Sequence, residues 1–315
     1  MNEQGRLNRA KKWCRTYWLE FGILLLGLIA LNFIFIAKAF RETGTVNPSS
    51  AGLLGDFVGG YIGSYFALVS VVLLYSTLKS QRKAYQLQSF EAKYFELVKM
   101  HRENVAELEI QGTSGRKIFV LMIRELRALL DVVNSVAVAR GQTLTQGQRM
   151  HIAYYCLFFG TGPNSSRMLR QSLSGFNSTF IDALEKELDS PETKQKAKEA
   201  RKLGFVPFEG HQSRLGHYYR HLYQAVRYVD QQTIDIDKYE YVKTIRAQLT
   251  THEQALLLLN SLTPIGNDWW ARGFTIRYRM VQNLPRHFFD PAGEIDLSTI
   301  FPKKYFEWED AESAT

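Results

Sequence analysis

Two long apolar stretches near the beginning of the chain constrain its fold more than any other feature. Residues 21–37 are apolar except for Asn32, and residues 57–78 contain no charged side chain. At a rise of about 1.5 Å per residue, each stretch is about long enough as a helix to cross a hydrocarbon core of roughly 30 Å. We therefore predict a transmembrane hairpin. Its expected boundaries are residues 1–80 for the hairpin and about 19–40 and 55–78 for its two spans.

Charges beside these stretches predict how the hairpin is oriented. Residues 1–18 contain five Lys or Arg and a single Glu, and three basic residues lie between positions 79 and 83. The connecting residues 41–52 carry one basic and one acidic side chain. Because Lys and Arg are enriched on the cytoplasmic side of membrane helices, we expect a multi-pass membrane protein with both termini in the cytoplasm. A cleavable signal peptide is the alternative for the first stretch, but no A-x-A-like cleavage site ends it.

Small residues recur at every fourth position of the second span and form one smooth face of a helix. They are Gly55, Gly59, Gly63 and Ala67. Gly60 widens this stripe, and small residues allow another membrane helix to approach closely. The stripe either packs the two spans of one hairpin together or packs hairpins of several copies. In the second case Asp56 and Asn32 would face a shared polar path, because polar side chains are costly in lipid unless they are paired or hydrated.

The remainder of the chain has the pattern of an all-α protein. Apolar residues recur in steps of three and four, and no stretch alternates at period two for long enough to indicate a sheet. Thr250 and Glu253 form a capping box at the start of one helix. We expect a cytoplasmic helical domain after the hairpin. Its expected parts are a domain at 81–263, a stalk helix within it at 81–111, and an aromatic-rich C-terminal extension at 264–315.

Composition gives little support to the better-known enzyme classes. The two cysteines, Cys14 and Cys156, lie far apart and provide neither a disulfide framework nor metal-ligand spacing. The net charge of +8 is modest and partly belongs to the hairpin flanks, so it does not indicate nucleic-acid binding. No nucleotide-binding glycine loop or nucleophile elbow is present. These absences favour a non-enzymatic protein without a cofactor, a metal or a small-molecule substrate, while leaving an enzymatic role open.

The segment Gly216–Tyr223 is the most distinctive part of the soluble region. As a helix it separates two sets of side chains onto different faces. The expected buried face contains Leu215, Tyr219, Leu222, Val226 and Val229, and the other contains His217, Arg220, His221 and Gln224.

Three interpretations of this second face are open. Histidines at i and i+4 could bind a metal, although His217 and His221 have no third acidic or thiol ligand nearby in sequence. Histidine as general acid or base, with Arg220 stabilising a phosphorane, could cleave RNA. The spacing from Arg214 to either histidine differs from that of HEPN-type ribonucleases. The third interpretation is a buried hydrogen-bonded network that fixes helix packing.

Several of these segments together resemble the AbiC-like phage abortive infection proteins. The resemblance runs from the second span to about Asn260 and includes Phe90–Val105 and Phe158–Gly160. The segments that carry it are Gly55–Gly60, Gly216–Tyr223, Ile245–Thr250 with Glu253, and Leu257–Asn260. The motif residues within them are Gly216, His217, Arg220, His221, Tyr223, Arg246, Gln248, Glu253 and Asn260.

This resemblance implies a bacterial inner-membrane protein of antiphage defence. It implies partners in a larger defence system such as a retron, with its reverse transcriptase and nucleic acid, and it implies no established catalytic residue. With the residue pattern, it predicts an effector whose helical domain holds the hairpins inactive. An infection signal then releases them, copies of the chain rearrange in the lipid bilayer, and the membrane leaks. The alternatives are a membrane-tethered HEPN-like ribonuclease using His217, Arg220 and His221, and a scaffold that uses the hairpin only as an anchor.

Overall fold

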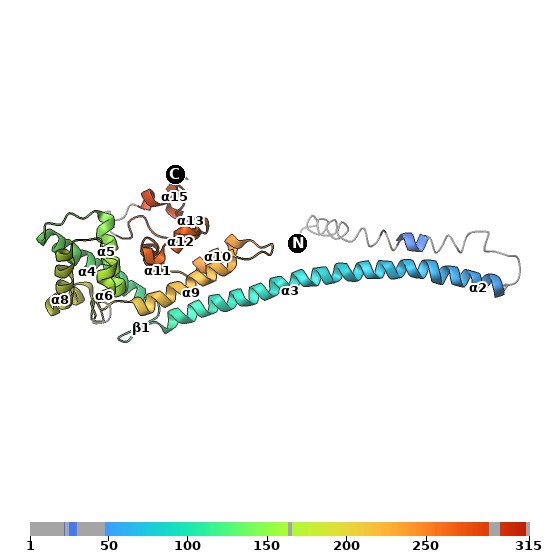
Figure 1. Cartoon of the computed structure of the whole chain (residues 1–315), viewed down its shortest axis with the longest axis horizontal. Coiled ribbons are helices and arrows are strands. Elements are labelled where there is room, and N and C mark those ends of the chain that lie inside the picture. Colours follow the sequence, from blue (N-terminus) through green and yellow to red (C-terminus); the bar gives the residue numbers. More distant parts are fainter. Residues whose placement is uncertain (1–21, 23–24, 30–47, 163–165, 290–296, 313–315) are drawn as a thin grey trace. The chain divides into compact units, whose positions relative to one another are not determined.

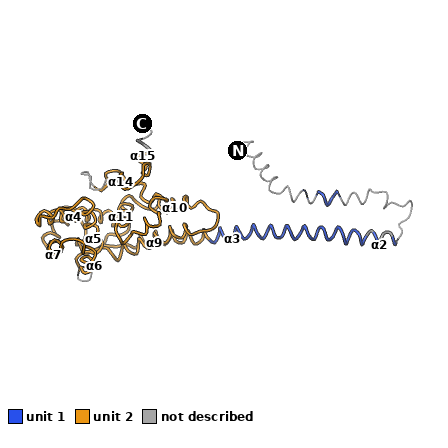
Figure 2. Tube along the Cα trace, turned by 45° about the horizontal axis from the view of Figure 1, so that its top comes forward, with its two compact units in different colours: residues 1–89 blue, residues 90–315 orange. Residues whose placement is uncertain are grey.

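The computed structural model describes residues 22, 25–29, 48–162, 166–289 and 297–312. These residues are mostly α-helical, as the sequence predicted (Figure 1). The β structure among them is one hairpin whose two strands have two residues each. They divide into two compact units, residues 1–89 and 90–315 (Figure 2).

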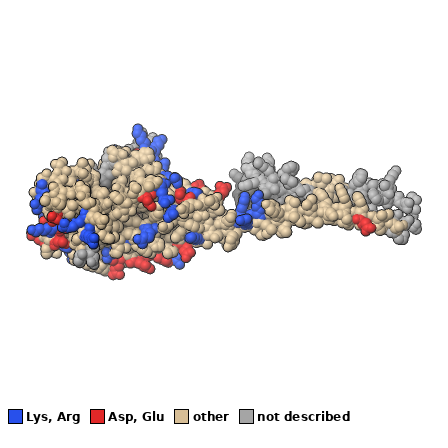
Figure 3. Space-filling model, in the orientation of Figure 1, with Lys and Arg blue, Asp and Glu red and all other residues tan. Residues whose placement is uncertain are grey.

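An uninterrupted helical stretch begins in unit 1, and its last residues belong to unit 2. It consists of α2 (Pro48–Phe57), a π turn η2 (Val58–Ile62) and α3 (Gly63–Glu107). Among the described residues, one helix, Gly55–Glu107, is long and apolar enough to cross a membrane, and its apolar window is almost wholly exposed. Figure 3 shows charged side chains spread over unit 2 and nearly absent from the apolar part of α3.

The first predicted span, 19–40, lies outside the described residues except for Gly22 and residues 25–29, which are helical. A Cβ atom built on Gly27 would lie 3.0 Å from Cζ of Phe66, so this helical segment packs against α3. The two-span hairpin therefore stays a prediction, and the second span alone has a helix that matches it in length and composition.

Unit 2 is built around α4 (Lys117–Ala139), which contacts α5, α7, α8 and α11. These neighbours bury most of α4, and a narrow exposed side remains at Arg124, Asp131 and Ser135. The other elements of unit 2 are β1 (Glu109–Ile110), β2 (Thr113–Ser114), α5 (Gln146–Phe159), α6 (Ser166–Ser172), α7 (Ser178–Asp189), α8 (Pro191–Arg201), α9 (Gln212–Asp230), α10 (Lys238–Arg246), α11 (Thr251–Ser261), η3 (Pro264–Gly266), α12 (Asp268–Ala271), α13 (Phe274–Arg277), α14 (Leu297–Ile300) and α15 (Glu307–Glu312).

The last third of α3 packs antiparallel against α9. The rings of Phe90 and Tyr228 are 5.5 Å apart, and those of His101 and Tyr218 are 5.1 Å apart. Residue numbers along α3 thus increase where those along α9 decrease, so the two helices run in opposite directions. Figure 1 shows them side by side. Residues 81–107 of the predicted stalk belong to α3, and the C-terminal portion of that helix is packed into the core of unit 2. The predicted end at residue 111 is wrong, because the helix ends at Glu107 and Glu109–Ile110 form β1.

The loop before α9 is anchored to α4 and α5 by buried hydrogen bonds. Glu125 of α4 is fully buried; its Oε1 accepts a hydrogen bond from the Phe208 N–H at 2.6 Å, and its Oε2 is bonded to His211 Nε2 at 2.6 Å. The His211 N–H donates to the carbonyl groups of Leu157 and Phe158 at the end of α5. These contacts fix where α9 begins.

Described residues of the predicted C-terminal extension pack into unit 2. Tyr305 and Phe306 are buried, and the Tyr305 hydroxyl donates to the Thr275 carbonyl at 2.8 Å. The capping box of Thr250 and Glu253 is confirmed at the start of α11.

Gly210 is required where this loop touches α5. Its φ is +85°, and a Cβ atom built on it would lie 2.1 Å from the Phe159 carbonyl oxygen. Gly210→Ala is expected to lower the free energy of unfolding by at least about 2 kcal/mol, because strain and a backbone clash add. Thermal unfolding of the full-length protein in detergent measures this. Gly175→Ala, at a glycine with open space around it, is the control, and equal stability of both variants would contradict the assignment.

Candidate functional site

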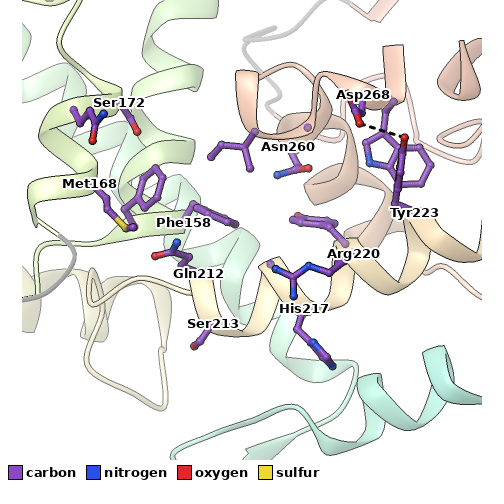
Figure 4. Close-up of a pocket in the computed structure, with 17 residues that line it drawn as sticks. Phe158, Met168, Ser172, Gln212, Ser213, His217, Arg220, Tyr223, Asn260 and Asp268 are labelled. Atoms are coloured by element: carbon purple, nitrogen blue, oxygen red, sulfur yellow. Dashed lines mark hydrogen bonds between the residues drawn. The ribbon is translucent and has the colours of Figure 1, made fainter. Parts of the chain in front are cut away.

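A cleft of about 960 Å³ opens in unit 2 between α5, α6, α9 and the segment that follows α11 (Figure 4). Figure 4 shows Phe158 and Met168 on one side, Tyr223 and Asp268 on the other, and Arg220 between them. Polar side chains from four segments line it, together with the edges of buried aromatic rings. The polar lining residues are Gln171, Ser172, Gln212, Ser213, His217, Tyr219, Arg220, Tyr223, Asn260 and Asp268.

Helix α9 supplies one wall of the cleft because its two faces have different environments. The apolar face predicted from the sequence is buried, as Leu215, Leu222 and Val226 show. His217 and Arg220 are exposed on the other side. The interpretation of these two side chains as part of a buried hydrogen-bonded network is therefore wrong. At 100° per residue they point away from the core that holds α9.

Five of the nine predicted motif residues converge on this cleft. They are Gly216, His217, Arg220, Tyr223 and Asn260. Gly216 lies where α9 approaches α5, since a Cβ atom there would be 4.0 Å from Cζ of Phe158. Gln212, Trp269 and Asp268 also line the cleft and were not singled out from the sequence. The sequence signal that could have identified Asp268 and Trp269 is their position shortly after Asn260, the last motif residue.

The wall opposite α9 is held by contacts at the end of α11. The Asn260 side-chain amide donates to the Tyr154 hydroxyl at 3.0 Å. A Cβ atom on Gly266 would lie 2.4 Å from Oδ1 of Asn260, so only glycine fits at this position of η3. The Tyr223 hydroxyl donates to Oδ2 of Asp268 at 3.3 Å and ties α9 to α12.

The motif residues outside the cleft have contacts that stabilise the fold. Glu253 is fully buried, caps α11, and accepts a hydrogen bond from the Tyr218 hydroxyl at 3.1 Å. Arg246 donates to the carbonyl groups of Tyr278 and Arg279 and is also buried. The Gln248 carbonyl accepts from Arg116.

His221 lies beside the cleft and is not part of its lining. Its ring is 4.5 Å from that of His217, measured between centroids. Partial burial, followed by the charges of His217 and Arg220, lowers the pKa of His221. The three residues of the proposed ribonuclease face are thus neighbours on the outer side of α9, with Arg220 directed into the cleft and His221 outside it.

His101 is a titratable residue whose position the sequence indicated only through its place on the apolar face of a helix. It is 3% exposed, and neither ring nitrogen has a hydrogen-bond partner among the described residues. Burial, followed by the charges of His221 and Arg116, lowers its pKa to about 4. His101 therefore sits uncharged at the contact between α3 and α9 at neutral pH.

The small-residue stripe on the second span faces open space within the described part of the chain. No atom lies within 4 Å of a Cβ built on any of its glycines, Gly55, Gly59, Gly60 and Gly63. The π turn, in which the Gly63 N–H donates to the Val58 carbonyl, interrupts the four-residue spacing. Ala67 and Asp56 are exposed, and Asn32 lies outside the described residues.

Within the described residues, no group of three or more His, Cys, Asp or Glu side chains could hold a metal ion. Cys156 is fully buried, and burial raises the pKa of its thiol, which makes it unreactive.

The comparison with known families identifies the segment that carries most of the cleft. Residues 210–289 match the model of the family described as "Putative phage abortive infection protein". This confirms the resemblance for the motifs between Gly216 and Asn260 and extends it to residue 289, whereas the second span and Phe90–Val105 lie outside the match. No curated protein and no solved structure shows significant similarity to the chain.

Acid is expected to weaken the α3–α9 contact through His101. The unfolded chain binds a proton there near the ordinary pKa of 6.5, and the folded chain does so only near pH 4. The stability that the neutral ring contributes is therefore full above pH 6.5 and is lost as the pH falls towards 4. His101→Leu should reduce that loss by roughly 3 kcal/mol in unfolding measured across this pH range. His287→Leu, at an exposed histidine, should retain the wild-type loss; identical curves for wild type and His101→Leu would refute the assignment.

Proposed function

We propose that this protein is a membrane-anchored effector of bacterial defence against phage, which permeabilises the inner membrane when infection triggers it. The family match supports a role in abortive infection. The membrane part of the proposal is supported by one observation above all. The helix Gly55–Glu107 exposes a long uncharged apolar surface, and burying that surface in lipid is far more favourable than leaving it in water.

The same helix offers a route from the domain to the membrane. Phe90, Tyr94, His101 and Val105 of α3 are buried in unit 2, where they pack against α9 and α10. Helix α9 lies within the segment that matches the family model. A change at α9 would therefore alter the packing of the helix that contains the candidate span, and this physical continuity supports a regulated effector.

The glycine stripe supports self-association as the means of opening a leak. Its glycines have no described neighbour, and small residues on a lipid-facing helix favour close helix–helix contact. Contact with Gly27 is instead made by Phe66. We expect the stripe to contact other copies of the chain, with Asp56 at its outer end as a polar group beside a water-filled path.

The decisive measurement is the membrane potential of single cells, followed with a voltage-sensitive dye after phage infection of cells carrying the protein with its neighbouring genes. Wild-type cells should depolarise early. Gly59→Leu should abolish depolarisation, because a bulky side chain separates helices that must touch. Val72→Leu adds one methylene at an exposed position away from the stripe and should behave as wild type. Undiminished depolarisation with normally expressed Gly59→Leu would sink the proposal.

A membrane-tethered ribonuclease is the second candidate, because His217 and His221 lie 4.5 Å apart beside Arg220. It predicts RNA breakdown in infected cells whose membranes stay polarised. Killing would then be lost in His221→Ala, and deletion of residues 1–80 would leave killing intact. The effector proposal expects the opposite result from the deletion.

A further inference from the structure

We propose that the cleft beside α9 binds a nucleotide: a small ligand with a phosphate group at Arg220 and a flat base between the apolar side chains of its rim. The carrying observations are the cavity itself and an exposed arginine within it that has no charge partner. Sequence reasoning did not reach this site, because its lining comes from four separate segments and contains no phosphate-binding glycine loop.

The charge of the cleft favours an anionic ligand. Arg220 forms no ion pair or hydrogen bond with any described residue, and its charge acts on the neighbouring His221. The acidic group in the lining, Asp268, accepts a hydrogen bond from Tyr223, on which the charge of Arg272 also acts. Arg220 is thus the unmatched charge, and a guanidinium presents paired donors that suit phosphate oxygens.

The neutral polar side chains suit a sugar and a base edge. Gln171 and Ser172 come from α6, and Gln212 and Ser213 begin α9. None of these four side chains has a hydrogen-bond partner among the described residues. Their amides and hydroxyls both donate and accept, as sugar hydroxyls and base edges require. The first turn of α9, which has no side-chain cap, adds to the preference for negative charge.

The rim of the cleft has two apolar side chains that a flat ring would cover. Met168 is 45% exposed and belongs to α6, and Ile265 is 43% exposed and belongs to η3. Both line the cleft, although they come from different elements. A planar base between them would remove apolar surface from water.

The size of the cleft favours a ligand larger than a lone phosphate. Its volume of about 960 Å³ is at the upper end of the range for ligand pockets. Gln212 and Arg220 are eight positions apart on one helix, or about 12 Å along its axis. A ligand that reaches both ends therefore carries its anionic group well away from its hydrogen-bonding groups.

The test is equilibrium dialysis of the full-length protein in detergent with labelled AMP, GMP and ATP, together with quenching of tryptophan fluorescence, because Trp269 lines the cleft. At least one nucleotide should bind saturably. Arg220→Ala should weaken binding at least tenfold, as loss of a charged hydrogen bond does. Arg220 is exposed, so the variant should fold normally, which circular dichroism checks. Arg214→Ala is the matched control, since Arg214 is on the same helix, bonds to the Glu109 carbonyl and does not line the cleft.

Three results would overturn the proposal. They are no saturable binding of any of the three nucleotides, equal weakening by both arginine variants, and displacement by orthophosphate as strong as by the nucleotide. Binding of a single-stranded tetranucleotide that the mononucleotides cannot displace would also overturn it and identify a nucleic-acid strand instead. None of these experiments needs an intact membrane, so their failure would leave the effector proposal untouched.

Discussion

The buried hydrogen bonds of Glu125 are the interaction on which the rest of unit 2 depends. This carboxylate, in the middle of the central helix α4, bonds both to the backbone of Phe208 and to the ring of His211. A buried carboxylate without such partners would be very costly, so the loop before α9 is held in one place. Phe208, at φ +70°, keeps an unfavourable backbone conformation there. The close passage of Gly160 past Gly210 completes the anchor.

The proposed nucleotide site and its proposed link to the membrane helix follow from where this anchor places α9. One side of the helix forms a wall of the cleft, and another side packs along the end of α3. A ligand in the cleft would therefore contact the same helix that packs against the end of α3. Tyr218 shows how close the two sides are, because it contacts His101 of α3 and donates to the buried Glu253 of α11, while Tyr219 lines the cleft. Coupling between the two sides would require α9 to have two arrangements, each favoured differently by the ligand and by α3.

The motif residues divide into two groups that the sequence did not distinguish. Glu253 and Arg246 are buried and satisfy backbone or side-chain groups, so their substitution is expected to act through stability. Arg220 and His217 are exposed, and their side chains form no hydrogen bond or ion pair with any described residue. Stability therefore does not explain their presence. Helical periodicity correctly separated Leu215 and Leu222 from Arg220. It could not say whether the polar side would meet solvent, another helix or a cavity, because that depends on segments distant in sequence.

The sequence by itself determined the features that depend on local spacing. These are the helical class, the apolar stretch at 57–78, the capping box of Thr250 and the buried face of α9, and each follows from residues within a few turns of one another. Only the tertiary structure decided which segments form the cleft and that His101 meets Tyr218. It also decided that Glu125 bonds to a loop more than eighty positions away. No periodic pattern in the sequence predicts such contacts, because they join groups far apart along the chain. They form only when the helices pack together.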